Sequence, residues 1–148
     1  MTDNTNNRRS WMIVSAHDAA ALARCADIKP DVVVLDLEYT VPPKAKAAAR
    51  EGLTAVIQKL ADSQVEVFVR IDRDTRWADV RAAVTRGIRG IVFPGADSTG
   101  EVAEVGELIT AIERERGVEP GATELVLMLE SARGFWNADG LSGFGLSD

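Results

Sequence analysis

Short apolar runs alternate with longer segments of helical periodicity along most of this chain of 148 residues. This alternation is typical of βαβ units, in which each strand runs parallel to the one before it. The expected strands lie at residues 11–14, 32–35, 65–71, 90–94, 125–129 and 143–146. The expected helices lie between them, at residues 19–26, 44–61, 78–86 and 101–116. The pattern therefore predicts an α/β fold with a parallel sheet of about six strands.

The second expected strand, residues 32–35, is apolar without a break and is followed by acidic residues and two prolines. An unbroken apolar run indicates a strand that is covered on both faces. Asp36 and Glu38 are two residues apart, so they should point to the same side at the carboxyl end of this strand. These acids either form caps and turns, as Asp commonly does, or belong to a functional site.

Charged residues also stand where later strands end. Arg70 and Asp72 close the third strand, Glu130 follows the fifth, and Asp148 follows the sixth. In a barrel of parallel strands, active sites are built on this face from several strands. Carboxylates that converge without Cys or paired His suit Mg²⁺ rather than Zn²⁺. Arg70, which is planar and always charged, suits bidentate binding of a substrate carboxylate.

Composition narrows the class of protein. The formal net charge of −6 argues against nucleic acid as a partner. The single Cys25 cannot form an internal disulfide, the first residues are polar, and no apolar run reaches membrane-spanning length. We expect a cytoplasmic protein without a membrane partner, with a disordered polar tail at residues 1–8 and one domain at residues 9–148.

Five segments, taken in chain order, carry a resemblance to a known family. They read RSWMIV at 9–14, VLDLE at 34–38 with VPP at 41–43, VRI at 69–71 with TRW at 75–77, GIVFP at 90–94, and LESARG at 129–134. Together they resemble the citrate lyase β-subunit family, the HpcH/HpaI aldolase group of Mg²⁺-dependent carbon–carbon lyases. The correspondence covers nearly the whole chain from Arg9 onward.

The resemblance implies a TIM-barrel fold and the cleavage or formation of a bond between an acyl-CoA and a 2-oxo acid such as oxaloacetate or glyoxylate. It implies Mg²⁺ as the cofactor, because Glu130 falls on a metal-ligand glutamate of the family. Asp148, within the FGLSD run at 144–148, falls on the metal-ligand aspartate. It also implies a homo-oligomer for the full-length form.

The same resemblance assigns the substrate side of the site. Arg70 falls on the arginine that holds the substrate's carboxylate, and Glu38 on the acid that closes the second strand and supports the site. The expected catalytic residues are therefore Arg70, Glu38 and Asp36. Arg70 and Arg9 are the expected substrate-binding residues.

The chain departs from the family pattern near this site. Tyr39 stands where the family usually has an acid, Ser15 and Ala16 stand where it has Pro-Gly, and Gly95 stands where it has a lysine. A full barrel takes about 250 residues and eight strands. The expected fold is therefore a partial TIM barrel, truncated on its C-terminal side.

Two alternatives to the enzyme stay open. A catalytically inactive or truncated homologue would act as a binding protein or be a fragment, because the departures lie at the site. Residues 30–36 also resemble the phosphoacceptor strand of receiver domains, which have a doubly wound fold. That fold needs a further acid after the first strand and a lysine after the fifth, where Ser15 and Glu130 stand instead.

Overall fold

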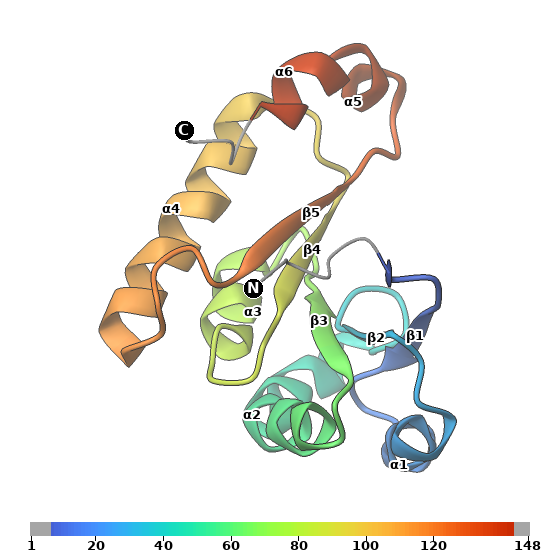
Figure 1. The fold of residues 1–148 in the computed structure, drawn as a ribbon. Coiled ribbons are helices and arrows are strands. Elements are labelled where there is room, and N and C mark those ends of the chain that lie inside the picture. Colours follow the sequence, from blue (N-terminus) through green and yellow to red (C-terminus); the bar gives the residue numbers. More distant parts are fainter. Residues whose placement is uncertain (1–6, 144–148) are drawn as a thin grey trace.

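The computed structural model describes residues 7–143 and contains one sheet of five parallel strands. Each strand is hydrogen-bonded to the next along the chain, in the order β1-β2-β3-β4-β5 (Figure 1). The strands are β1 (Trp11–Ser15), β2 (Val32–Asp36), β3 (Glu66–Arg70), β4 (Gly90–Pro94) and β5 (Glu124–Met128). The helices are α1 (Ala19–Ile28), α2 (Lys46–Asp62), which follows the 3₁₀ turn η2 (Pro43–Ala45), α3 (Arg76–Ala83), α4 (Thr99–Arg116), α5 (Ala132–Trp136) and α6 (Ala138–Ser142).

The strand order decides between the two predicted α/β folds. In a receiver-like doubly wound sheet, β1 lies between β2 and β3. Here β2 pairs with both β1 and β3, and winding continues in sequence to β5. Sequential parallel winding is the arrangement of a (β/α) barrel, so the receiver-like alternative is excluded and the partial barrel is supported.

The main core lies between the sheet and the helices. Alternate strand residues such as Val33, Leu35 and Val67 join helix residues such as Leu53 and Ile57 in one cluster of buried side chains. The other strand residues form a smaller apolar cluster on the opposite face of the sheet, around Val34 and Phe68. The sheet is therefore apolar on both faces, which explains the unbroken apolar run in β2.

Several helices begin or end at capping residues. The Asp18 side chain accepts a hydrogen bond of 2.9 Å from the backbone N–H of Ala21 and begins α1. Ser98 caps α4 in the same way. Gly117 ends α4 in the left-handed conformation, with φ of 65°. None of the helices among residues 7–143 is long and apolar enough to cross a membrane.

The two ends of the described region differ from expectation. Arg8 was assigned to the disordered tail, but its guanidinium pairs with Glu66 and Glu124 at the amino ends of β3 and β5. Residues 1–6 of the expected tail lie outside the described part of the chain.

The segment after β5 also differs. Two short helices, α5 and α6, occupy residues 132–142, where no element was expected. Ser131 begins α5 by accepting a hydrogen bond of 2.9 Å from the backbone N–H of Gly134. Gly143, the first residue of the expected sixth strand, caps α6 instead. The rest of that strand, and Asp148, lie outside the described residues.

Candidate active site

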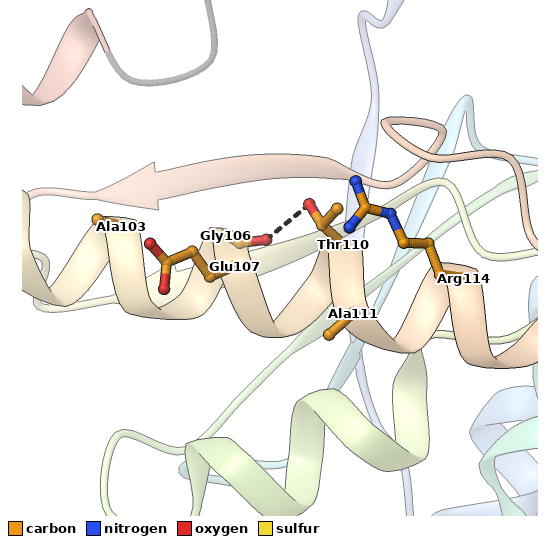
Figure 2. A pocket seen from close by; sticks show the side chains of 6 residues that line it. All are labelled: Ala103, Gly106, Glu107, Thr110, Ala111 and Arg114. Atoms are coloured by element: carbon orange, nitrogen blue, oxygen red, sulfur yellow. Dashed lines mark hydrogen bonds between the residues drawn. The ribbon is translucent and has the colours of Figure 1, made fainter.

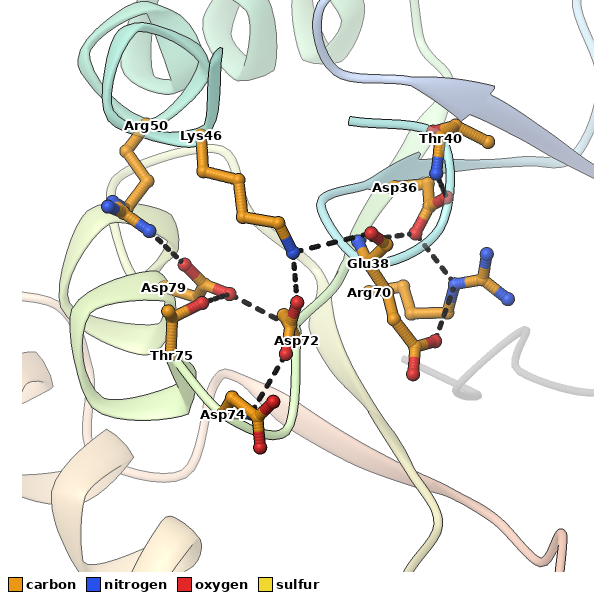
Figure 3. A network of polar contacts seen from close by, with 10 residues as sticks. All are labelled: Asp36, Glu38, Thr40, Lys46, Arg50, Arg70, Asp72, Asp74, Thr75 and Asp79. Carbon is orange, nitrogen blue, oxygen red and sulfur yellow. Dashed lines mark hydrogen bonds and ion pairs between the residues drawn. The ribbon is translucent and has the colours of Figure 1, made fainter. Parts of the chain in front are cut away.

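A buried ion pair joins the carboxyl ends of β2 and β3. Asp36 and Arg70 are register partners in the parallel pairing of these strands. Arg70 Nε donates a hydrogen bond of 2.8 Å to Asp36 Oδ1, and both side chains are buried (Figure 3). The same Nε lies 3.6 Å from Glu38 Oε2, so both acids do point to one side.

Both carboxylate oxygens of Asp36 accept hydrogen bonds. Besides Arg70, Asp36 accepts hydrogen bonds from the backbone N–H groups of Glu38 (2.9 Å) and Thr40 (3.0 Å). Burial raises the pKa of Asp36, but the hydrogen bond from Arg70 and those from the following turn outweigh burial and hold this pKa below its ordinary value. Asp36 is therefore ionised, and it orients both Arg70 and the turn that carries Glu38.

The side chain of Glu38 has fewer hydrogen-bond partners than that of Asp36. The Oε2 of Glu38 is buried and has no hydrogen-bond partner among the described residues. Burial raises the pKa of Glu38, Arg70 opposes this effect, and the charge of Glu130 adds to it. The ring of Tyr39 lies over the Arg70 guanidinium, with 5.2 Å from Cζ to the ring centroid, and is 74% exposed. Glu38, Tyr39 and Arg70 thus form the open side of the site.

A buried lysine, which the sequence analysis did not single out, supports this group from α2. Lys46 Nζ pairs with the Asp72 carboxylate and donates a hydrogen bond of 3.3 Å to the backbone O of Glu38 (Figure 3). Behind it, the fully buried Asp79 accepts hydrogen bonds from Arg50 (2.9 Å) and from the backbone N–H of Asp72 (2.8 Å). The sequence signal was the proline pair shortly before α2, because it starts the helical segment close to the end of β2.

Glu130 lies at the same end of the sheet, two residues after β5, and is exposed. Its Oε2 is 3.8 Å from the point that a Cβ on Gly95 would occupy, so it faces the carboxyl end of β4. Its charge raises the pKa of Glu38 and of Tyr39, although for Tyr39 the nearer Glu38 has the larger effect. The structure therefore brings Asp36, Glu38, Arg70 and Glu130 to one end of the sheet.

A separate hollow of about 450 Å³ lies along α4 and is unrelated to this group (Figure 2). Its lining residues all belong to α4: Ala103, Gly106, Glu107, Thr110, Ala111 and Arg114. The Thr110 hydroxyl donates its hydrogen bond of 3.0 Å back to the Gly106 carbonyl. The hollow therefore contains none of the residues expected to act on a substrate.

A family model decides what kind of protein this is. The model described as HpcH/HpaI aldolase/citrate lyase matches residues 9–142. The chain belongs to the HpcH/HpaI aldolase/citrate lyase family. The resemblance of the five sequence segments is confirmed.

Curated members of the family are about twice as long as this chain. The citrate lyase subunit beta of Haemophilus influenzae is 30% identical over 89% of this chain and 46% of its own length. The L-malyl-CoA/beta-methylmalyl-CoA lyase of Cereibacter sphaeroides (strain ATCC 17025) is 33% identical over 78% of this chain and 38% of its own length. The chain thus spans less than half the length of these HpcH/HpaI relatives.

Solved structures show the same fold. A native malate synthase of Haloferax volcanii with glyoxylate superposes with a TM-score of 0.76 and 20% identity, over 93% of this chain and 47% of that one. Its magnesium/glyoxylate complex gives a TM-score of 0.74 and 21% identity, over 91% of this chain and 45% of that one. The predicted partial barrel of this HpcH/HpaI family member is confirmed.

Arg9, which the family resemblance assigned to the site, is not brought together with Arg70. Arg9 precedes β1, where its backbone N–H donates a hydrogen bond of 2.9 Å to Asp31. Asp31 precedes β2, so Arg9 lies at the amino end of the sheet, opposite to Arg70. The position of Arg9 before the strand expected at residues 11–14 was the sequence signal for this, since active sites of such barrels lie at the carboxyl ends of the strands. Asp148 lies outside the described residues.

The donor atoms near Glu130 fit the Mg²⁺ that the HpcH/HpaI resemblance implies. This end of the sheet offers carboxylate oxygens, including those of Glu130 and the unpartnered Oε2 of Glu38. Mg²⁺ prefers oxygen ligands, keeps several waters, and is commonly held by one or two carboxylates. Within residues 7–143 no group of three or more His, Cys, Asp or Glu side chains could hold a metal ion. Among the described residues, Glu130 is the one that the family resemblance assigns as a metal ligand.

Proposed function

We propose that this chain forms the oxo-acid-binding part of a Mg²⁺-dependent carbon–carbon lyase, which cleaves or forms a bond between an acyl-CoA and a 2-oxo acid. The observation that carries this proposal is the way in which Arg70 is held. Its Nε is occupied by Asp36, and no hydrogen bond from a described residue occupies its two terminal nitrogens. A guanidinium anchored in this way is ready to bind a carboxylate through the terminal Nη groups.

Arg70 would bind and orient the substrate. The carboxylate of a 2-oxo acid such as glyoxylate or oxaloacetate would pair with the Nη groups, while Asp36 keeps the guanidinium from rotating. Fixing the acid in this way aligns the bond that forms or breaks. Lys46, through Asp72 and the Glu38 carbonyl, holds the loop on which Glu38 and Tyr39 are carried.

Glu130, with Asp148, would hold Mg²⁺, and the bound ion would act as a Lewis acid on the oxo group. Glu38 would lie beside it as a buried carboxylate whose free Oε2 can accept a hydrogen bond from the hydroxyl group that the oxo group becomes in the joined acyl-CoA. The acyl-CoA enolate on the other side of the reaction needs hydrogen-bond donors to its developing negative charge.

A second candidate is a binding protein of the same family without catalysis. Tyr39 favours it, since its ring covers one face of Arg70 at a position where the resemblance leads to an acid. The two candidates share oxo-acid binding and differ in turnover.

Titration calorimetry with glyoxylate and oxaloacetate tests the shared part. Arg70→Lys keeps the charge but loses the planar fork, so we expect about 10- to 100-fold weaker binding. Arg81→Lys is the matched control, because Arg81 lies on the surface and its ion pair among the described residues is with exposed Glu115. Unchanged affinity in Arg70→Lys would rule out both candidates. An acyl-CoA cleavage assay with Mg²⁺ then separates them: thioester turnover supports the lyase, and oxo-acid binding without turnover supports the binding protein.

A further inference from the structure

Gly95 is the first residue after β4. The position that its side chain would occupy lies against the side chain of another residue. The φ of Gly95 is 61°, in the left-handed region that favours glycine. A Cβ placed there would lie 2.9 Å from Arg73 Nη1. The space beside Gly95 is therefore taken by the guanidinium of Arg73, from the loop after β3.

Arg73 is held by three partners on the β4–α4 segment. Its Nη1 donates to the backbone O of Gly95 and lies 3.8 Å from Asp97 Oδ2, and its Nη2 donates to Glu101 Oε1 at 2.5 Å. Two carboxylates thus face one guanidinium. An arginine whose charge is already offset twice is poorly suited to attract a substrate anion, and well suited to connect two loops.

Asp97 continues this connection to the loop after β5. Its Oδ1 accepts the hydrogen bond of the Ser131 hydroxyl, and its backbone O accepts one of 2.8 Å from Asn137 Nδ2. A Cβ on Gly134 would lie 2.7 Å from the Ala96 carbonyl, so α5 packs directly on this segment. Ser131 is the residue after Glu130. A continuous set of polar contacts therefore runs from Arg73 through Asp97 to the neighbour of Glu130.

We propose that Arg73 is a positioning residue, which holds Glu130 in place for a divalent cation through Asp97 and Ser131, and that Gly95 is required because it leaves room for the guanidinium. This inference rests on the proposed function only in taking Glu130 as a metal ligand. Groups that hold a metal ligand in place typically contribute 10- to 100-fold to metal affinity, and Arg73 should act in this range.

The test is Mn²⁺ binding, measured by calorimetry on the full chain with the metal alone. Arg73→Met keeps most of the side-chain volume and removes the guanidinium, and should weaken Mn²⁺ binding by about 10- to 100-fold. Asp97→Asn is a second, gentler variant: it keeps an oxygen for Ser131 and removes the negative charge that faces Arg73, and should weaken binding in the same direction. Arg81→Met, which breaks an exposed ion pair with Glu115 between α3 and α4, is the matched control and should bind Mn²⁺ as the parent does.

Gly95→Ala provides a separate check of the packing. The added methyl group displaces the Arg73 guanidinium, so Gly95→Ala should weaken Mn²⁺ binding, and combining it with Arg73→Met should cause little further loss. Glu130→Gln separates the inference from the function on which it rests. If Glu130→Gln loses Mn²⁺ binding while folded Arg73→Met and Asp97→Asn bind normally, the positioning role is wrong and the metal role of Glu130 stands. If Glu130→Gln itself binds Mn²⁺ normally, the metal role fails, and the positioning role fails with it.

Discussion

Arg70 Nε and Asp36 Oδ1 lie 2.8 Å apart at the carboxyl ends of two adjacent strands, with the Asp36 side chain wholly removed from solvent. This ion pair belongs both to the core of the fold and to the candidate site. Removing one partner of a buried ion pair leaves the other charge without compensation and typically costs about 3–5 kcal/mol. Stability and substrate binding therefore depend on the same contact.

We expect Asp36→Ala to lower the free energy of unfolding by about 3–5 kcal/mol, because Arg70 and the N–H groups of Glu38 and Thr40 lose their acceptor. Asp36→Asn keeps an acceptor of similar size and should lose less. Urea unfolding at neutral pH measures both. Equal stability of Asp36→Ala and the parent chain would mean that the ion pair contributes nothing to the fold.

Glu38 should make the free energy of unfolding depend on pH with a sign opposite to that of an ordinary paired carboxylate. Its pKa is raised in the folded chain, chiefly by burial, so the folded state favours the protonated form. The stability that Glu38 contributes is therefore present below its unfolded pKa of about 4.3, and is lost as pH rises through the higher folded pKa.

Glu38→Gln removes this titration, so its stability relative to the parent should rise between about pH 4 and pH 7. Thermal unfolding across that range, for the variant and the parent, measures the difference. Glu51→Gln, on the exposed side of α2, is the control and should show no such trend. A stability difference between Glu38→Gln and the parent that does not change with pH would show that burial does not raise the pKa of this carboxyl group.

Lys46 should matter for stability although it lies on a helix with many exposed residues. Lys46→Met keeps the apolar stem but removes the donor to Asp72 and to the Glu38 carbonyl, and should cost about 1.5–3 kcal/mol. Lys44→Met, two residues earlier and exposed, should change stability by less than about 0.5 kcal/mol. The urea midpoints of the two variants compare their losses of stability directly. Similar midpoints would mean that Lys46 contributes no more to stability than an exposed lysine.

The edge of the sheet at β1 should promote association. Trp11 and Ile13 are 43% and 54% exposed, and among the described residues β1 pairs only with β2. An exposed apolar edge strand invites pairing with another chain. We expect this chain to form oligomers or larger aggregates as its concentration rises, as measured by size-exclusion chromatography with light scattering.

Ile13→Lys should reduce that association, because charged side chains discourage edge pairing. Ile28→Lys is the matched control, since Ile28 is 58% exposed but ends α1 rather than lining the edge. A monodisperse monomer at every concentration, or equal effects of the two lysines, would contradict a role for the β1 edge.

Local sequence signals predicted most of the elements. β4 has the bounds expected from its apolar run, and α4 ends before Gly117 as predicted, because periodicity, β-branched residues and glycine act over a few neighbouring residues. The two short helices after β5 were missed, because a five-residue helix has too few turns to show a period.

The sequence by itself determined the α/β alternation, the family, and the gathering of Asp36, Glu38, Arg70 and Glu130 at strand ends. Only the tertiary structure decided which of these residues touch. The register of β2 against β3 pairs Asp36 with Arg70, and the path of α2 brings Lys46 to Asp72. The space beside Gly95, which has no side chain, is occupied by Arg73 from another loop. Such contacts join residues far apart in the chain, and their geometry depends on packing that no short stretch of sequence contains.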